Sequence, residues 1–170
     1  PSVPPETETP DEPELNTEDH YAYIVGYPDG TVRPEGNITR AEVATIFFRL
    51  LTDESRDAFW SQTNNYSDVS DYTDVDADAW YNNAVSTLTN AGILDGYEDG
   101  TFKPDGNITR AEFATIAVRF FEATYDGEDL FSDIAGHWAQ DYINEAANAG
   151  IVDGYPDGTF RPQQLITRAE

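Results

Sequence analysis

The five-residue sequence Ile-Thr-Arg-Ala-Glu occurs three times in this chain of 170 residues, at 38–42, 108–112 and 166–170. In the first two copies it stands directly before an apolar run. Threonine and glutamate three positions apart form a capping box, in which each side chain accepts a hydrogen bond from a free backbone amide at the helix start. Ile38 and Val43 flank the first box as a hydrophobic staple does. Each copy therefore predicts the start of a helix, and the third, at the end of the sequence, is expected to be frayed.

The arginine of the repeated sequence is out of place for a residue that only forms a helix. Arg40, Arg110 and Arg168 fall at the first helical position, where the helix macrodipole disfavours a cation by a few tenths of a kcal/mol. The same placement in three copies indicates a role beyond helix formation.

A second repeated sequence, Gly-Tyr-Pro/Glu-Asp-Gly-Thr, begins at Gly26, Gly96 and Gly154. Its Asp-Gly pair predicts a tight turn with the second glycine in the left-handed conformation, in a short hairpin or extended loop. A proline follows each turn and prevents the chain from continuing as helix before the capping box. These prolines are Pro34, Pro104 and Pro162.

Apolar residues recur at helical spacing over 80–91 and 138–149, and each run is closed by a glycine, Gly92 or Gly150. The predicted unit is thus helix, turn, helix. The fold class predicted is mostly α, built from such repeats with short β-hairpin-like turns. The first unit lacks its leading helix and the third lacks its trailing helix.

The repeats divide the chain into four parts. Residues 1–14 are rich in proline and acids and are expected to be a disordered linker. The repeats follow at 15–72, 73–130 and 131–170, and the first contains an insertion, Asp53–Tyr72, for which the sequence suggests no function. Because there is no methionine, even at position 1, we expect the chain to be an excerpt of a longer protein.

The composition excludes several classes of function. Nine basic residues against 33 acidic ones give a net charge of −24, which disfavours binding to nucleic acid or to an anionic membrane. There is no cysteine for a disulfide or a thiolate metal site, and no apolar stretch approaches the length of a membrane span. His20 and His137 are isolated, and no nucleophile elbow or phosphate loop is present. We therefore expect no catalysis, cofactor or metal.

The repeated turn, the repeated box and the sequence Phe-Ser-Asp-Ile at 131–134 with Trp138 resemble the repeats of the S-layer homology (SLH) family, from about residue 15 to the end. The resemblance implies an extracellular, pseudo-threefold module on the surface of a bacterium with a Gram-positive type envelope. It also implies non-covalent anchoring to an anionic, often pyruvylated, secondary cell-wall polysaccharide. In the family, the arginine of the box contacts the acidic sugar in a groove between adjacent repeats.

This resemblance gives the arginines a reason, because a carboxylate at a helix N-terminus meets free amides and a guanidinium fork together. Two tryptophans offer flat faces for sugar stacking, and turn glycines allow the backbone to approach a ligand. The predicted polysaccharide-binding residues are Arg110, which ranks first, Arg40, Arg168, Trp80, Trp138, Gly96 and Gly154. Second-rank candidates are Arg33, Lys103 and Arg161.

Each of these predictions has a structural alternative. The arginines could instead form ion pairs across repeat boundaries, each worth about 0–1 kcal/mol if exposed, in a module that assembles with its own copies or other S-layer proteins. Trp80 and Trp138 could be plain core residues, and the sequence favours neither reading. The tyrosines of the three turns are expected to pack within the turns. They are Tyr27, Tyr97 and Tyr155.

Calcium-dependent cohesion is a third hypothesis. Asp74, Asp76 and Asp78 alternate as in a calcium loop, but Ala79 and Val85 occupy the positions that need glycine and glutamate. We therefore expect this run to be a solvated segment before a helix.

Overall fold

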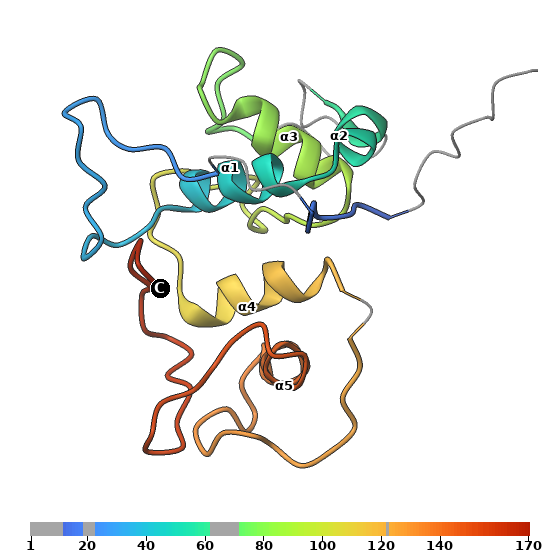
Figure 1. Ribbon diagram of the computed structural model, residues 1–170, viewed down its shortest axis with the longest axis vertical. Helices are drawn as coiled ribbons and strands as arrows, with labels where there is room; N and C mark the ends of the chain where they lie inside the picture. The colour runs from blue at the N-terminus through green and yellow to red at the C-terminus, as the bar shows by residue number, and fades with distance from the viewer. Residues whose placement is uncertain (1–11, 19–22, 62–71, 122) are drawn as a thin grey trace, which may run out of the picture.

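The computed structural model describes residues 12–18, 23–61, 72–121 and 123–170, and this part of the chain is mostly helical, as predicted. Helices α1, α2 and α3 form one half of the molecule, and α4 and α5 form the other (Figure 1). The helices are α1 (Arg40–Leu50), α2 (Asp53–Phe59), α3 (Asn82–Asn90), α4 (Arg110–Val118) and α5 (Gln140–Asn148). Strand pairing within the described residues is limited to isolated bridges.

The first two capping boxes are confirmed. The Thr39 side chain accepts from the Glu42 amide, and the Glu42 carboxylate accepts from the Thr39 amide at 2.9 Å. Thr109 and Glu112 repeat both bonds at the start of α4. The third box is formed in part, and the expectation that it is frayed stays a prediction. Although no helix follows it within the 170 residues, the Thr167 amide donates to Glu170 at 3.0 Å.

The three turns have the predicted form. In the first, the Tyr27 amide donates to the Thr31 carbonyl at 2.8 Å and the Gly30 amide donates to the Tyr27 carbonyl at 2.9 Å. Gly30 has a φ of 78°, and Gly100 and Gly158 repeat it with 79° and 80°. The left-handed conformation of these glycines explains why the turn sequence ends in Asp-Gly each time.

The leading helices of the second and third repeats are α3 and α5, which begin two residues after their tryptophans. Gly92 and Gly150 follow them with φ of 71° and 72°, as their predicted role as closing residues requires. The first repeat has no leading helix among residues 12–18 and 23–39.

The predicted insertion contains α2, whose N-cap is Thr52. Residues 62–71 of the insertion, and residues 1–11 of the predicted linker, lie outside the described residues. Nearer the repeats, Pro13 is buried and the Glu14 amide donates to Ser55 Oγ at 2.8 Å. The segment before the first repeat is therefore packed on α2 from at least Pro13.

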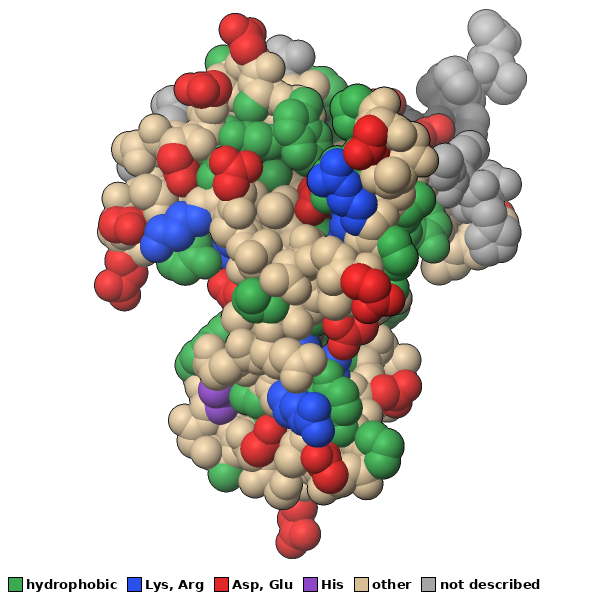
Figure 2. All heavy atoms as spheres, turned by 90° about the vertical axis from the view of Figure 1, so that its left-hand side faces the viewer, with side chains coloured by type: hydrophobic (Ala, Val, Ile, Leu, Met, Phe, Trp, Pro, Cys, Tyr) green, Lys and Arg blue, Asp and Glu red, His purple; other side chains and the backbone are tan. Residues whose placement is uncertain are grey.

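The trailing helix of each repeat packs on the leading helix of the next, which gives the pairs α1 with α3 and α4 with α5. Phe102 and Phe160, one residue after the second and third turns, are fully buried in the two resulting cores. Phe47 of α1 joins the halves, with its ring centroid 5.1 Å from that of Phe120, just after α4. A view at right angles shows the two halves as lobes with a narrower waist between them (Figure 2).

At the waist, the isoleucines that precede the three boxes form a closed ring of backbone hydrogen bonds. Ile108 donates to Ile38, Ile166 donates to Ile108, and Ile38 donates to Ile166, each at 3.2 Å. The box following each isoleucine is tied into the same ring, and the C-terminal end of the chain lies between the starts of α1 and α4 (Figure 1). This ring relates the three repeats by a pseudo-threefold axis.

The box arginines add a second ring in which the donors run in the opposite direction, because each arginine pairs with the capping glutamate of the following repeat. Arg40 lies 3.5 Å from Glu112, Arg110 lies 3.5 Å from Glu170, and Arg168 lies 2.5 Å from Glu42. The arginine side chains are only 8%, 12% and 5% exposed. Inter-repeat ion pairing, the structural alternative foreseen for these residues, is what the structure contains.

Each box arginine also donates to two backbone carbonyls of the following repeat. Arg40 Nε donates to Phe102 at 2.8 Å, and its Nη2 donates to Asp95 at 3.0 Å. Arg110 and Arg168 repeat this pattern with Phe160 and Asp153, and with Val32 and Val25. A planar fork with several donors can hold all three acceptors at once, which a lysine cannot do.

We predict that Arg40→Ala lowers the free energy of unfolding by about 2–4 kcal/mol, because it removes the side-chain donor to the Phe102 and Asp95 carbonyls and the cation beside the Glu112 carboxylate. Arg33→Ala is the matched control, since the Arg33 and Asp29 side chains of its ion pair are 54% and 52% exposed. That control should lower the free energy of unfolding much less, because exposed ion pairs are weak. Urea denaturation of the two variants makes the comparison, and equal losses would contradict the role assigned to Arg40.

A second prediction concerns the acidic limit of stability. The Thr159 hydroxyl and Arg161 donate to Asp157, which lowers the pKa of that carboxyl from 3.8 to about 2, and Asp29 is shifted in the same way. Since the folded pKa is the lower one, this stabilisation is complete above about pH 4 and is lost as the pH falls toward 2. Thr159→Val should raise the pKa of Asp157, while Asp29 serves as the internal control. An NMR titration of the carboxyl groups measures both pKa values. A pKa of Asp157 that is the same in Thr159→Val and in the wild type would refute the prediction.

Candidate functional site

Three grooves run along the boundaries between repeats, and each contains one box arginine. Groove A contains Arg40, groove B contains Arg110 and groove C contains Arg168. Their volumes are about 240, 270 and 480 Å³. The other walls come from the turn of the next repeat and, in grooves A and C, from its trailing helix.

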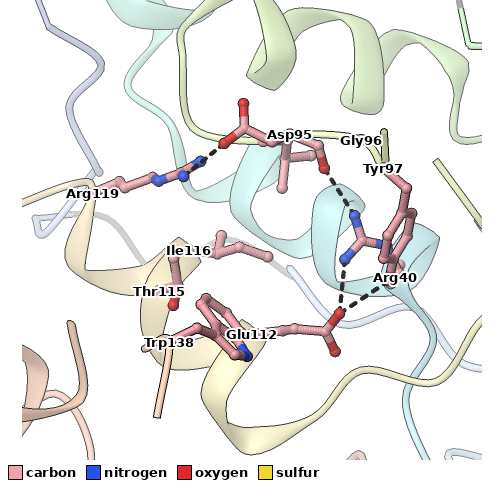
Figure 3. Close-up of a pocket in the computed structure, with 10 residues that line it drawn as sticks. Arg40, Asp95, Gly96, Tyr97, Glu112, Thr115, Ile116, Arg119 and Trp138 are labelled. Atoms are coloured by element: carbon pink, nitrogen blue, oxygen red, sulfur yellow. Dashed lines mark hydrogen bonds and ion pairs between the residues drawn. The ribbon is translucent and has the colours of Figure 1, made fainter. Parts of the chain in front are cut away.

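Groove A shows how these walls are held together (Figure 3). Arg40 reaches the backbone of Asp95 beside the second turn, and the Asp95 carboxylate pairs with Arg119 of the segment ending α4 at 2.6 Å. The Tyr97 hydroxyl donates to Glu112 at 3.0 Å. The turn and the helix are thereby fixed at both ends of the groove.

Trp138 lies across groove A from Asp95, beside α4 (Figure 3). Its side chain is 60% exposed, and Trp80, the equivalent residue in groove C, is 67% exposed. Trp138 comes from the third repeat, while the other walls of groove A come from the first and second. Trp80 comes from the second repeat, while the other walls of groove C come from the third and first. Each of these grooves is therefore lined by all three repeats. The alternative that these tryptophans are core residues is wrong, because both present an accessible indole face to a groove.

Groove C repeats the arrangement of groove A with Arg168, Tyr27, Glu42 and Trp80 in the corresponding places. Groove B differs from both, since its lining among the described residues includes Arg110 and Glu170 but no tryptophan. The structure therefore brings tryptophans together with Arg40 and Arg168. It does not bring one to Arg110, the arginine that the sequence ranks first.

The turn glycines have a structural reason for being glycine. A Cβ at Gly96 would overlap the Tyr72 ring and lie 2.8 Å from the Thr101 carbonyl oxygen. A Cβ at Gly154 would overlap the Phe131 ring in the same way. Internal packing thus requires these glycines, and their predicted contact with a ligand stays a prediction.

The turn tyrosines do more than pack within the turns. Each ring lies between two cations: the box arginine of the preceding repeat, at 4.8–5.0 Å from the ring centroid, and a basic residue of its own turn, at 3.8–3.9 Å. The basic turn residues are Arg33, Lys103 and Arg161, with φ of 53°, 57° and 58°. This left-handed backbone is costly for a side chain other than glycine and holds the second-rank candidates beside the grooves.

Two aspartates, Asp74 and Asp133, hold the second and third turns through backbone amides. Asp74 accepts from the amides of Phe102 and Lys103 at 2.7 and 2.8 Å. Asp133 accepts from the equivalent amides in the third repeat at the same distances. The expectation of a solvated segment before a helix therefore fails at Asp74, whereas Asp76 and Asp78, ahead of α3, are exposed as expected. The shared Ser/Thr-Asp-apolar sequence was the signal for this role.

No group of three or more acidic or histidine side chains is arranged to hold a metal ion in the part of the chain that the structure describes. Over the same residues, no helix has the length and apolar character needed to cross a membrane.

The chain matches the sequence model of the S-layer homology domain over residues 21–44, 71–114 and 130–170. It is 47% identical over 165 residues to cell surface glycoprotein 1 of Acetivibrio thermocellus, covering 89% of this chain and 7% of that protein. It is 42% identical over 160 residues to the cellulosome-anchoring protein of the same organism, covering 91% and 34%. An amylopullulanase of Thermoanaerobacterium thermosulfurigenes is 34% identical over 156 residues, covering 86% and 8%.

This chain therefore spans between 7% and 34% of the length of these relatives. The matched segments cover most of the chain and include the three turns and the three boxes that form the ring. The chain belongs to the S-layer homology domain family.

Proposed function

We propose that this chain is a non-catalytic module that anchors its protein to the bacterial cell wall, by binding an anionic secondary cell-wall polysaccharide in grooves A and C. The observation that carries the proposal is the exposed tryptophan in each of these grooves, beside a box arginine and a turn tyrosine. An aromatic face with nearby fixed donors suits a sugar ring that carries a carboxylate, such as a pyruvate ketal.

The distribution of charge supports an anionic ligand. The chain has a net charge of −24, so a polyanion is repelled by most of its surface. Eight of the nine basic residues nevertheless belong to the boxes, the turns or the walls of grooves A and C, and the exception is Arg56 of α2. The grooves are therefore where an anion meets the least repulsion.

The relatives are consistent with a role in attachment. One is named a cellulosome-anchoring protein and another a cell surface glycoprotein. The amylopullulanase is named as an enzyme, but only 8% of it corresponds to this chain, so a common module attached to different proteins explains all three names. We therefore propose that the module acts at the surface of a bacterium with a Gram-positive type envelope, where other S-layer proteins are further candidate partners.

A second candidate function is structural assembly without glycan binding. It is favoured by the box arginines, which are buried and paired with the next repeat. In this case the arginines only close the ring, and the exposed tryptophans contact other surface proteins. The two functions differ in whether polysaccharide is needed for binding to the wall.

We predict that replacing both Trp80 and Trp138 with alanine abolishes binding to purified cell-wall sacculi with little change in melting temperature. Each indole is more than half exposed, so its removal leaves no cavity. Trp60→Ala is the matched control, because Trp60 is 45% exposed and lies outside the three grooves. Co-sedimentation with sacculi measures the loss.

The same experiment with sacculi stripped of polysaccharide separates the two candidate functions. The anchoring proposal requires that the wild-type chain no longer sediments with stripped sacculi. Undiminished sedimentation would refute it and leave structural assembly.

A further inference from the structure

Grooves A and C share their design but differ at the residue before the turn glycine. In groove A this residue is Asp95, and in groove C it is Val25. The backbone at this position has the same task in both, since each carbonyl accepts from the Nη2 of the box arginine, at 3.0 and 3.1 Å. The side chain is therefore free to differ without changing how the repeats are joined.

The difference changes the charge inside the groove. Among the described residues, groove A is lined by two carboxylates, that of Asp95, which pairs with Arg119 at 2.6 Å, and that of Glu112, whereas groove C is lined by that of Glu42 alone. Both grooves contain the box arginine and a second arginine, Arg119 or Arg49, at corresponding places. An anion is therefore repelled by one fewer carboxylate in groove C.

The two grooves also differ in how much apolar surface their walls expose. Tyr23, Ile24 and Val25 are 41%, 41% and 56% exposed, while Ile93 and Leu94, the equivalents of Tyr23 and Ile24, are buried at 2%. Apolar side chains gather on the upper lobe of the face that carries the first turn (Figure 2). Groove C has twice the volume of groove A, about 480 against 240 Å³.

We propose that groove C is the primary ligand site, that it selects a carboxylated sugar with an apolar substituent, and that Val25 and Asp95 set its preference over groove A. This inference rests on the proposed function, because it assumes that both grooves bind the wall polysaccharide. The carboxylate lies nearest the arginine end, and the apolar substituent contacts Ile24 and Val25. Groove A is the weaker second site.

Each groove can be measured alone by removing the tryptophan of the other. With Trp138→Ala, binding of soluble fragments of the purified wall polysaccharide reports groove C, and with Trp80→Ala it reports groove A. Isothermal titration calorimetry should show tighter binding in the first variant. Equal affinities, or tighter binding in the second variant, would overturn the assignment of groove C as primary.

Exchanging the side chains at positions 25 and 95 tests whether they cause the difference in affinity between grooves A and C. In the Trp138→Ala background, Val25→Asp should weaken binding about tenfold, because it restores a carboxylate close to the bound anion. In the Trp80→Ala background, Asp95→Val should strengthen binding by a similar factor. Melting temperatures close to those of the parent variants establish that both proteins are folded.

Two further variants control for the change in total charge. Leu130→Asp adds a carboxylate outside the three grooves, and Asp57→Val removes an exposed one from α2. Both should leave affinity unchanged. If they act as strongly as the exchanges in the grooves, or if the exchanges have no effect while the parent variants still bind, the inference is wrong although the proposed function stands. If the wild-type chain binds no fragment, the proposed function itself fails.

Discussion

The ring of three backbone hydrogen bonds between Ile38, Ile108 and Ile166 is the contact on which the rest of the structure depends. Each bond joins a different pair of repeats, so displacing one repeat breaks two of the three. The capping glutamates couple this ring to the helices. One carboxylate oxygen of Glu112 accepts from the Thr109 amide at the start of α4, while the other faces Arg40 of the preceding repeat. Helix initiation and repeat assembly thus use the same side chain.

The grooves follow from this coupling. Because Arg40 binds the backbone of Asp95 as well as Glu112, it fixes the second turn and the start of α4 at one boundary. Trp138 of the third repeat then completes the wall. A groove of this kind exists only when three repeats are closed around the axis, so the groove is a property of the assembled module and not of a single repeat.

The sequence predicted the features whose residues lie within a few positions of one another along the chain. Threonine and glutamate of a capping box are three residues apart, and the Asp-Gly turns are equally short, so both could be identified without the structure. The contact of Asp74 with the Phe102 amide, and the meeting of Arg40 with Trp138, join distant parts of the chain. They depend on the order of the repeats around the axis, which no short pattern contains. The ranking of Arg110 above the other arginines rested on the completeness of its repeat, and it stays a prediction, although the described lining of groove B contains no tryptophan.

The structure also changes the argument about the box arginines. A cation at the first helical position needs compensation, and Arg40 obtains it from the Glu112 carboxylate and two backbone carbonyls without any ligand. Three of its five N–H donors are thereby used, and its side chain is 8% exposed. A ligand could reach only the remaining edge of the guanidinium. Under the proposed function, the arginine sets the shape and potential of the groove, and the exposed tryptophan offers a sugar its largest contact area.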